Sequence, residues 1–148
     1  MVLNRTGLNF TNTNPIIIST LKEFYFPGTR GSLGEKHAHM FSSSIEEGPG
    51  SNELEIPLPM LAIVATTLHS ALDDWASGER KPTDFNAERY EDVYNAHVTT
   101  LKTIQKKKLK YHRLMSNLYN AASSKASIRS TNMARNAIAL LNLDAMEE

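Results

Sequence analysis

The run from Pro59 to Ser77 constrains the fold more than any other part of the chain. Apolar side chains recur along it at spacings of 4, 3, 4 and 3, at Leu61, Ala65, Leu68, Leu72 and Trp75. That spacing places them on one face of an α-helix. The polar side chains form only a narrow stripe, made of Thr66, Ser70, Asp73 and Ser77. We therefore expect a central buried helix near 59–77, ended by the left-handed conformation that Gly78 favours.

Three further helix starts are marked by residues whose side chains can accept hydrogen bonds from free backbone N–H groups. These predicted caps are Asn14, Ser32 and Asn86. Asn14 is followed by a proline, and Ser32 by a glutamate three residues later, which are both typical of a helix start. Phe85, just before the third cap, is placed to pack on Tyr90 as a hydrophobic staple. The amphipathic pattern then continues to about Ile104.

The basic run Lys106–Lys110 marks a helix end or hinge, and apolar spacing predicts another helix from there to about Ala122. A weaker last helix is expected over roughly 127–141. The segment 53–59 alternates polar and apolar residues, but its prolines forbid a central strand, so we expect an extended lead-in to the central helix. No segment predicts a strand. The fold class is therefore all-α, a single compact bundle of about six helices.

The 148 residues suit one domain, and a hydrophobic content of 41% is enough to build its core. We expect a single helical domain over 1–148, with a flexible start (1–13), an internal loop (42–55) and a frayed tail (142–148). No apolar run approaches the roughly 18 residues that would span a bilayer, and the start lacks the features of a signal peptide. These features favour a soluble protein inside the cell, cytoplasmic or nuclear, with no membrane partner.

The formal net charge is zero, but it is a cancellation between segments. Residues 35–101 hold four bases and twelve acids, whereas residues 102–135 hold nine bases and no acid. Such asymmetry can mark a surface that attracts an oppositely charged partner. The candidate contacts to nucleic acid or an acidic partner are Lys102, Lys106, Lys107, Lys108, Lys110 and Arg113. The alternative is that the acidic and basic helices simply lie against each other.

Candidate sites for chemistry are few. The chain has no cysteine, which excludes disulfides, thiolate nucleophiles and thiolate metal sites. Its five histidines show no metal-binding spacing, and no nucleophile elbow or phosphate-binding loop is present. His97 lies on an apolar helix face, which favours a hydrogen-bonded core histidine; the functional alternative is a polar pocket that it shares with Tyr94 and His112. We expect no cofactor, no metal and no enzyme activity.

Two functions fit these features. The first is a non-enzymatic protein-interaction module, with a protein partner or a homo-oligomer. The alternative is a helical nucleic-acid-binding domain that uses the basic segment 102–135, in which Tyr111 and Tyr119 would stack on bases. Both tyrosines also fit the spacing of a helix core, and the hinge at Lys106–Lys110 is a candidate helix-turn-helix turn, with Arg113, Asn117 and Asn120 facing the bases.

The order and spacing of several groups of residues resemble a known family. The groups are Leu58–Leu72, Trp75, Ser77-Gly78, Phe85, Tyr90, Tyr94–His97, Leu101, Tyr111–Met115 and Tyr119. They resemble an uncharacterised domain-of-unknown-function family of mushroom-forming basidiomycete fungi, over roughly residues 16–122. The resemblance implies a helical fold and transfers no catalytic residue. It also implies that family members carry more helical sequence before Ile16, so we expect a short member.

Overall fold

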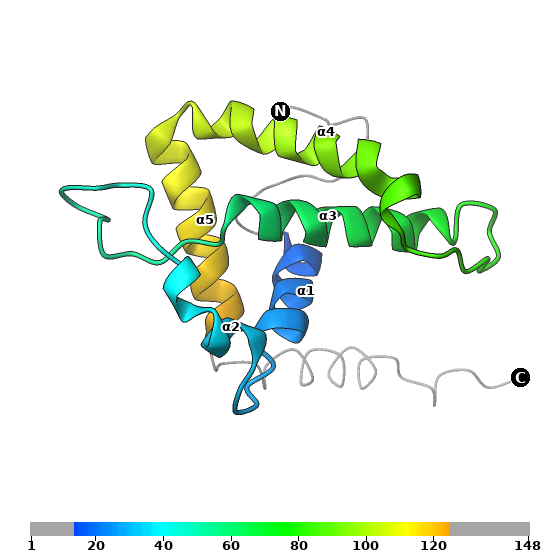
Figure 1. Ribbon diagram of the computed structural model, residues 1–148, viewed down its shortest axis with the longest axis horizontal. Helices are drawn as coiled ribbons and strands as arrows, with labels where there is room; N and C mark the ends of the chain where they lie inside the picture. The colour runs from blue at the N-terminus through cyan, green and yellow to red at the C-terminus, as the bar shows by residue number, and fades with distance from the viewer. Residues whose placement is uncertain (1–13, 125–148) are drawn as a thin grey trace, which may run out of the picture.

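The computed structural model describes residues 14–124, and all regular structure in this range is helical (Figure 1). The elements are α1 (Pro15–Tyr25), α2 (Leu33–Lys36), a 3-10 turn η1 (Ala38–Met40), α3 (Leu58–Asp73), α4 (Ala87–Gln105) and α5 (Lys108–Ser123). The predicted all-α class is confirmed. The flexible start (1–13), the last helix (127–141) and the tail (142–148) that the sequence predicts lie outside the described residues.

The helices α3 and α4 form an antiparallel pair, and α5 and α1 pack across one end of it. Figure 1 shows α4 running back over α3 after the connection at residues 74–86, and α5 descending from the far end of α4. The helix α1 lies beside α5 and contacts α3 as well. Residues 41–57 have no regular structure and lead along α5 into the start of α3.

The core lies where α1, α3 and α5 meet, and the loop before α3 adds two side chains to it. Its fully buried apolar members include Leu21 of α1, Leu61 of α3, Met115 of α5, and Phe41 and Ile56 of the loop. Each such side chain contributes roughly 1.5–3 kcal/mol through removal from water. The predicted apolar face of α5 is confirmed, since its five members are all buried: Tyr111, Leu114, Met115, Leu118 and Ala122.

The helix starts are where the caps predict them. The Asn14 side chain accepts hydrogen bonds from the backbone N–H groups of Ile16 and Ile17. The side chains of Ser32 and Asn86 each accept one from the backbone N–H three residues later. Phe85 stacks on Tyr90 with ring centroids 5.3 Å apart, which confirms the staple. The predicted hinge is confirmed too, because α4 ends at Gln105 and α5 begins at Lys108.

The central helix differs from the prediction in its end and in its buried side. It ends at Asp73, four residues before Ser77, because the Asp74 carboxylate accepts hydrogen bonds from the backbone N–H and hydroxyl of Thr83 and so joins the connection to α4. Leu72 and Trp75, predicted to be buried, are 61% and 57% exposed. The prediction was wrong for these two side chains.

Two of the four side chains in the polar stripe of the central helix, Thr66 and Ser70, are buried on the side that faces α4, whereas Asp73 and Ser77 are exposed. Thr66 and Ser70 are 1% and 6% exposed. The hydroxyl of Thr66 donates to the carbonyl of Ala62 one turn earlier, and Ser70 hydrogen-bonds to the phenol of Tyr90 on α4. Because a short hydroxyl can find a partner inside or next to its own helix, its burial costs little. A polar stripe was therefore a poor guide to the exposed side.

Candidate functional site

His112 of α5 lies between two carboxylates of the loop that precedes α3. Its Nδ1 is 2.6 Å from Oε1 of Glu55, and its Nε2 is 2.9 Å from Oε2 of Glu53. The imidazole is 5% exposed and Glu55 is 4% exposed, whereas more than half of the Glu53 side chain is exposed. We call this group, His112 with Glu53 and Glu55, the histidine clasp.

Further hydrogen bonds fix both carboxylates of the clasp. The backbone N–H and the hydroxyl of Ser44 each donate to Oε1 of Glu55, at 2.8 Å, and the hydroxyl of Ser116 donates to Oε2 of Glu53 at 3.0 Å. Gly50 covers the ring, since a Cβ atom there would lie 2.6 Å from Nε2 of His112. The clasp therefore fastens the loop to α5 at several points.

The clasp holds the imidazole in its charged form. A carboxylate oxygen only accepts hydrogen bonds, so both ring nitrogens must donate, and only the imidazolium does that. The hydrogen bond to Glu55 is the largest of the effects that raise the pKa of His112, and Glu53 adds to it against the opposing effect of burial. Nearby, burial and the charge of Glu55 raise the pKa of Tyr111 to about 12. An imidazolium between two carboxylates stabilises a fold and leaves no free lone pair for a base.

The clasp is also a poor metal site. The two carboxylates lie against opposite ring nitrogens, so one ion cannot reach all three side chains. Within residues 14–124 no group of three histidines or acids is arranged to hold a metal. Its geometry is therefore that of a structural contact.

The candidate polar pocket of Tyr94, His97 and His112 is divided by the structure among three surroundings. His112 belongs to the clasp, and Tyr94 lines a groove between α3 and α4. His97 is fully buried on α4, where burial and, to a smaller extent, the charge of His69 lower its pKa. A lowered pKa favours the neutral imidazole, as expected for a core histidine.

The clasp was missed in the sequence, although two signals point to it. Glu53 and Glu55 are two residues apart in an extended segment, so their side chains lie on the same side. On α5, His112 and Ser116 are four residues apart and share one helix face. What the sequence lacks is a reason to join the two segments, which are 57 residues apart at the Glu55–His112 contact.

The six candidate basic residues gather at the corner between α4 and α5. We call them the basic corner: Lys102, Lys106, Lys107, Lys108, Lys110 and Arg113. All six are exposed. In the described part of the chain every ion pair involves a histidine, so none of the six is paired with a carboxylate.

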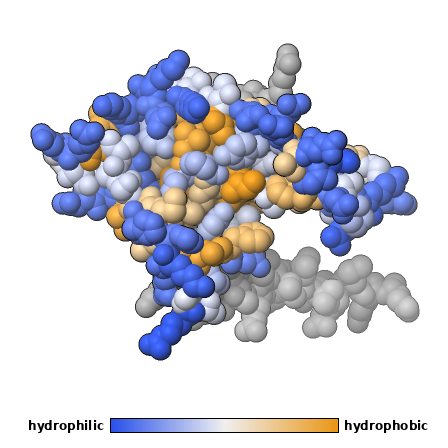
Figure 2. All heavy atoms as spheres, in the orientation of Figure 1, coloured by the Kyte–Doolittle hydropathy of each residue, from blue (hydrophilic) through white to orange (hydrophobic). Residues whose placement is uncertain are grey.

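The acids of α4 lie at its other end. Glu88, Glu91 and Asp92 are exposed in its first two turns, and a helix of 19 residues is about 28 Å long. The helices α4 and α5 do contact each other, but no ion pair within residues 14–124 joins an acid of one to a base of the other. On the face seen in Figure 2, hydrophilic side chains lie around the edges and apolar ones gather in the middle.

The groove between α3 and α4 is a hollow of about 400 Å³. Apolar and aromatic side chains line most of it, and its lining consists of Ile63, Thr66, Phe85, Asn86, Ala87, Tyr90, Glu91 and Tyr94. Phe85 is 48% exposed, which is unusual for a side chain of this size. The staple thus forms one wall of a surface groove as well as the start of α4.

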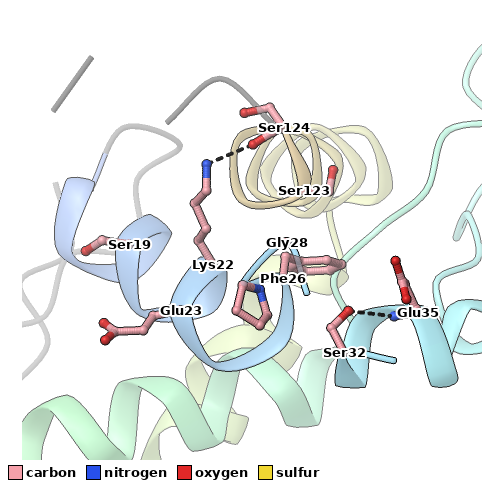
Figure 3. Close-up of a pocket in the computed structure, with 10 residues that line it drawn as sticks. Ser19, Lys22, Glu23, Phe26, Gly28, Ser32, Glu35, Ser123 and Ser124 are labelled. Atoms are coloured by element: carbon pink, nitrogen blue, oxygen red, sulfur yellow. Dashed lines mark hydrogen bonds between the residues drawn. The ribbon is translucent and has the colours of Figure 1, made fainter. Parts of the chain in front are cut away.

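A second hollow, of about 760 Å³, lies between α1, α2 and the end of α5 (Figure 3). Two of its three charged side chains, Lys22 and Glu35, are already engaged. Lys22 donates to the carbonyl of Ser124 at 2.8 Å (Figure 3). The carboxylate of Glu35 accepts from the backbone N–H of Gly31 at 2.7 Å. The hydroxyl of Ser32 caps α2 (Figure 3). Among its charged groups, the hollow therefore offers a ligand only the exposed carboxylate of Glu23.

Comparison with known proteins gives a family and no activity. No curated protein and no solved structure matches the chain. None of the helices in residues 14–124 combines the length and apolar character needed to cross a membrane. Residues 5–104 match a family described as a domain of unknown function, DUF6532, so the match includes α1 to most of α4 and stops before the clasp histidine. The chain belongs to the DUF6532 family.

Proposed function

We propose that this domain is a non-enzymatic protein-interaction module that binds an acidic partner at its basic corner. One observation carries the proposal: six bases are exposed together, and none has a carboxylate partner in the described residues. Charges of one sign that are not neutralised locally attract an opposite surface over about a Debye length, roughly 10 Å in moderate salt. We also propose, from the sequence, that the protein is fungal and acts in the cytoplasm or the nucleus.

The start of α5 supports the proposal because its charges are unfavourable for the helix itself. The residue before α5 is Lys107, whose side chain caps nothing, and the first turn holds Lys108 and Lys110 but no acid. The N-terminal end of a helix carries partial positive charge, so cations there destabilise it and an anion would stabilise it. A bound acidic partner would relieve this repulsion.

A protein partner is favoured over nucleic acid by what accompanies the bases. Leu109 stands among them and is 68% exposed, which offers apolar area that a protein can bury. The two tyrosines that would stack on bases are engaged elsewhere. Tyr111 is 5% exposed, and the ring of Tyr119 packs against Phe26 and Phe41 at 5.7 and 5.2 Å.

Nucleic-acid binding remains the second candidate because of one feature of α5. Lys110, Arg113, Asn117 and Asn120 follow at spacings of 3, 4 and 3 and are all exposed. They form one polar stripe along the helix, of the residue types that contact phosphates and base edges. A helix with such a stripe can lie in the major groove of DNA.

One binding experiment separates the two candidates. Labelled polyglutamate and a labelled DNA duplex of random sequence are titrated with the protein at about 50 mM and about 200 mM salt, and fluorescence anisotropy is measured. We expect polyglutamate to bind, and binding to weaken at least tenfold when Lys107, Lys108 and Lys110 are replaced by glutamine. Replacing three bases outside the corner, Lys36, Arg80 and Lys81, is the matched control and should leave binding unchanged.

Two results would contradict the proposal. Absence of polyglutamate binding at the lower salt would show that the corner attracts no acidic partner. Tighter binding to the duplex than to polyglutamate, lost in Asn117→Ala together with Asn120→Ala, would establish the second candidate in its place.

A further inference from the structure

We infer that the acidic partner of the basic corner is a second copy of this chain, whose α3–α4 groove receives Leu109. The inference rests on the proposed function, since it names the partner of the same surface. Each copy would insert Leu109 and its flanking lysines into the groove of the next copy, in a head-to-tail contact.

The groove has the shape and chemistry for an apolar side chain. Its volume of about 400 Å³ is larger than a single side chain needs. Its apolar lining includes Ile63, Phe85 and Tyr94. The stacking of Phe85 on Tyr90 holds this wall in place, at a centroid distance of 5.3 Å. A prearranged apolar hollow loses little side-chain freedom when it is filled, which favours binding.

The rim of the groove is acidic. Glu91 lies in its lining, Glu88 is one turn earlier on the same face of α4, and Asp84 precedes the cap of the helix. All three carboxylates are exposed. The base among them, Arg89, is placed over the ring of Tyr90 at 5.7 Å. The rim thus complements a positively charged segment that carries an apolar side chain.

The segment Lys107–Lys110 is of this kind. Leu109 is the most exposed of the large apolar side chains in the described residues, at 68%, and lysines precede and follow it. It stands in the first turn of α5, so it projects from a defined helix and not from a loop. An apolar residue inside a charged ring matches the common layout of interfaces, an apolar centre with a polar rim.

The two surfaces of one molecule cannot meet each other. The groove is lined by α4 residues as far as Tyr94, and the segment Lys107–Lys110 follows the end of α4, so that about 16 Å of helix separates them (Figure 1). The contact must join two copies. Because it pairs different surfaces, each dimer keeps one free groove and one free corner, and association continues into a chain or a ring.

The experiment uses two single variants that each remove one half of the contact. Leu109→Gln removes the inserted side chain, and Ala87→Arg places a bulky base in the groove lining, where Ala87 is exposed. Molar mass is measured by light scattering over increasing concentration in low salt. The wild-type mass should rise with concentration and fall again in high salt, and each variant alone should associate at least tenfold more weakly.

The mixture of the two variants is the decisive sample. Leu109→Gln keeps an intact groove and Ala87→Arg keeps an intact Leu109, so the equimolar mixture should form a one-to-one pair and nothing larger. Leu33→Gln, a change of another exposed leucine on α2, is the matched control and should associate as the wild type does. A mixture that stays monomeric, or self-association that both variants retain, overturns the inference.

The polyglutamate titration tells the failure of this inference from the failure of the proposed function. A wild-type chain that stays monomeric at every concentration but binds polyglutamate overturns the second copy as partner and leaves the interaction module standing. A monomeric chain that binds no polyglutamate overturns both.

Discussion

The helix α5 carries two kinds of positive charge that the fold treats in opposite ways. His112 is 5% exposed and lies between two carboxylates, whereas Lys108 and Lys110, within four residues of it, are exposed and have no carboxylate partner in the described chain. A buried charge is tolerated only when it is paired and hydrogen-bonded, and an exposed one needs neither. We therefore attribute a stabilising role to the clasp and the proposed partner binding to the corner.

The largest expected effect comes from removing the clasp histidine. His112→Ala should lower the free energy of unfolding by about 3 kcal/mol, because it leaves the carboxylate of Glu55 buried without its cation. Urea denaturation measures the loss. The matched control is His69→Ala, where the histidine is 3.6 Å from Asp73 in a partly exposed pair, and where the change should stay below about 0.5 kcal/mol. Equal losses in the two variants would show that burial of the clasp adds nothing.

The next effect comes from a glycine that touches the clasp. Gly48 and Gly50 have nearly the same φ, +97° and +98°, but only at Gly50 would a Cβ meet the His112 ring. Gly48→Ala should cost about 1 kcal/mol from backbone strain, and Gly50→Ala should cost about 1–3 kcal/mol more through overpacking. Both are read from urea denaturation. Equal costs would mean that the loop moves away from the ring freely.

A smaller effect is expected from pH. The pKa of His112 is raised in the folded chain, so the stability that it contributes is fully present below its unfolded value of about 6.5 and is lost as the pH rises through the folded value. The neutral ring keeps one of its two hydrogen bonds, and the other contributes about 1 kcal/mol. The free energy of unfolding should therefore fall as the pH rises above about 6.5, the unfolded pKa of histidine. A slope that persists in His112→Ala would assign it to another group.

The parts of the fold that could be predicted depend on neighbouring residues. Asn14 and Asn86 cap helices because the groups they bond are two or three residues away, and the apolar face of α5 follows from its own spacing. The side of α3 that is buried depends on which helix covers it. Since the hydroxyl of Thr66 donates to its own helix and that of Ser70 bonds to Tyr90 of α4, their polarity did not exclude burial against α4.

The candidate sites also differ in whether they depend on residues that are close in the sequence or on long-range packing. The basic corner was visible because its six bases are close in the sequence and a helix end exposes them. The clasp could not be predicted from the sequence, because its histidine and its carboxylates are brought together only by the packing of the loop on α5. Ile56 shows that packing directly, with its backbone N–H donating to the carbonyl of Met115 at 3.2 Å. No periodicity in either segment encodes this long-range contact.

The smallest effect has the opposite sign and tests the corner. Replacing Lys107, Lys108 and Lys110 by glutamine should raise the free energy of unfolding by a few tenths of a kcal/mol for each charge, because it removes cations from the positive end of α5. Urea denaturation in low salt measures the gain, and the Lys36, Arg80 and Lys81 variant should show none. The same three substitutions should weaken binding to polyglutamate. A gain in stability together with a loss of binding would mean that the chain keeps these lysines for a partner and against the stability of its own helix, as functional sites often do. A loss of stability would show instead that the lysines serve the fold, and the contrast with His112 would disappear.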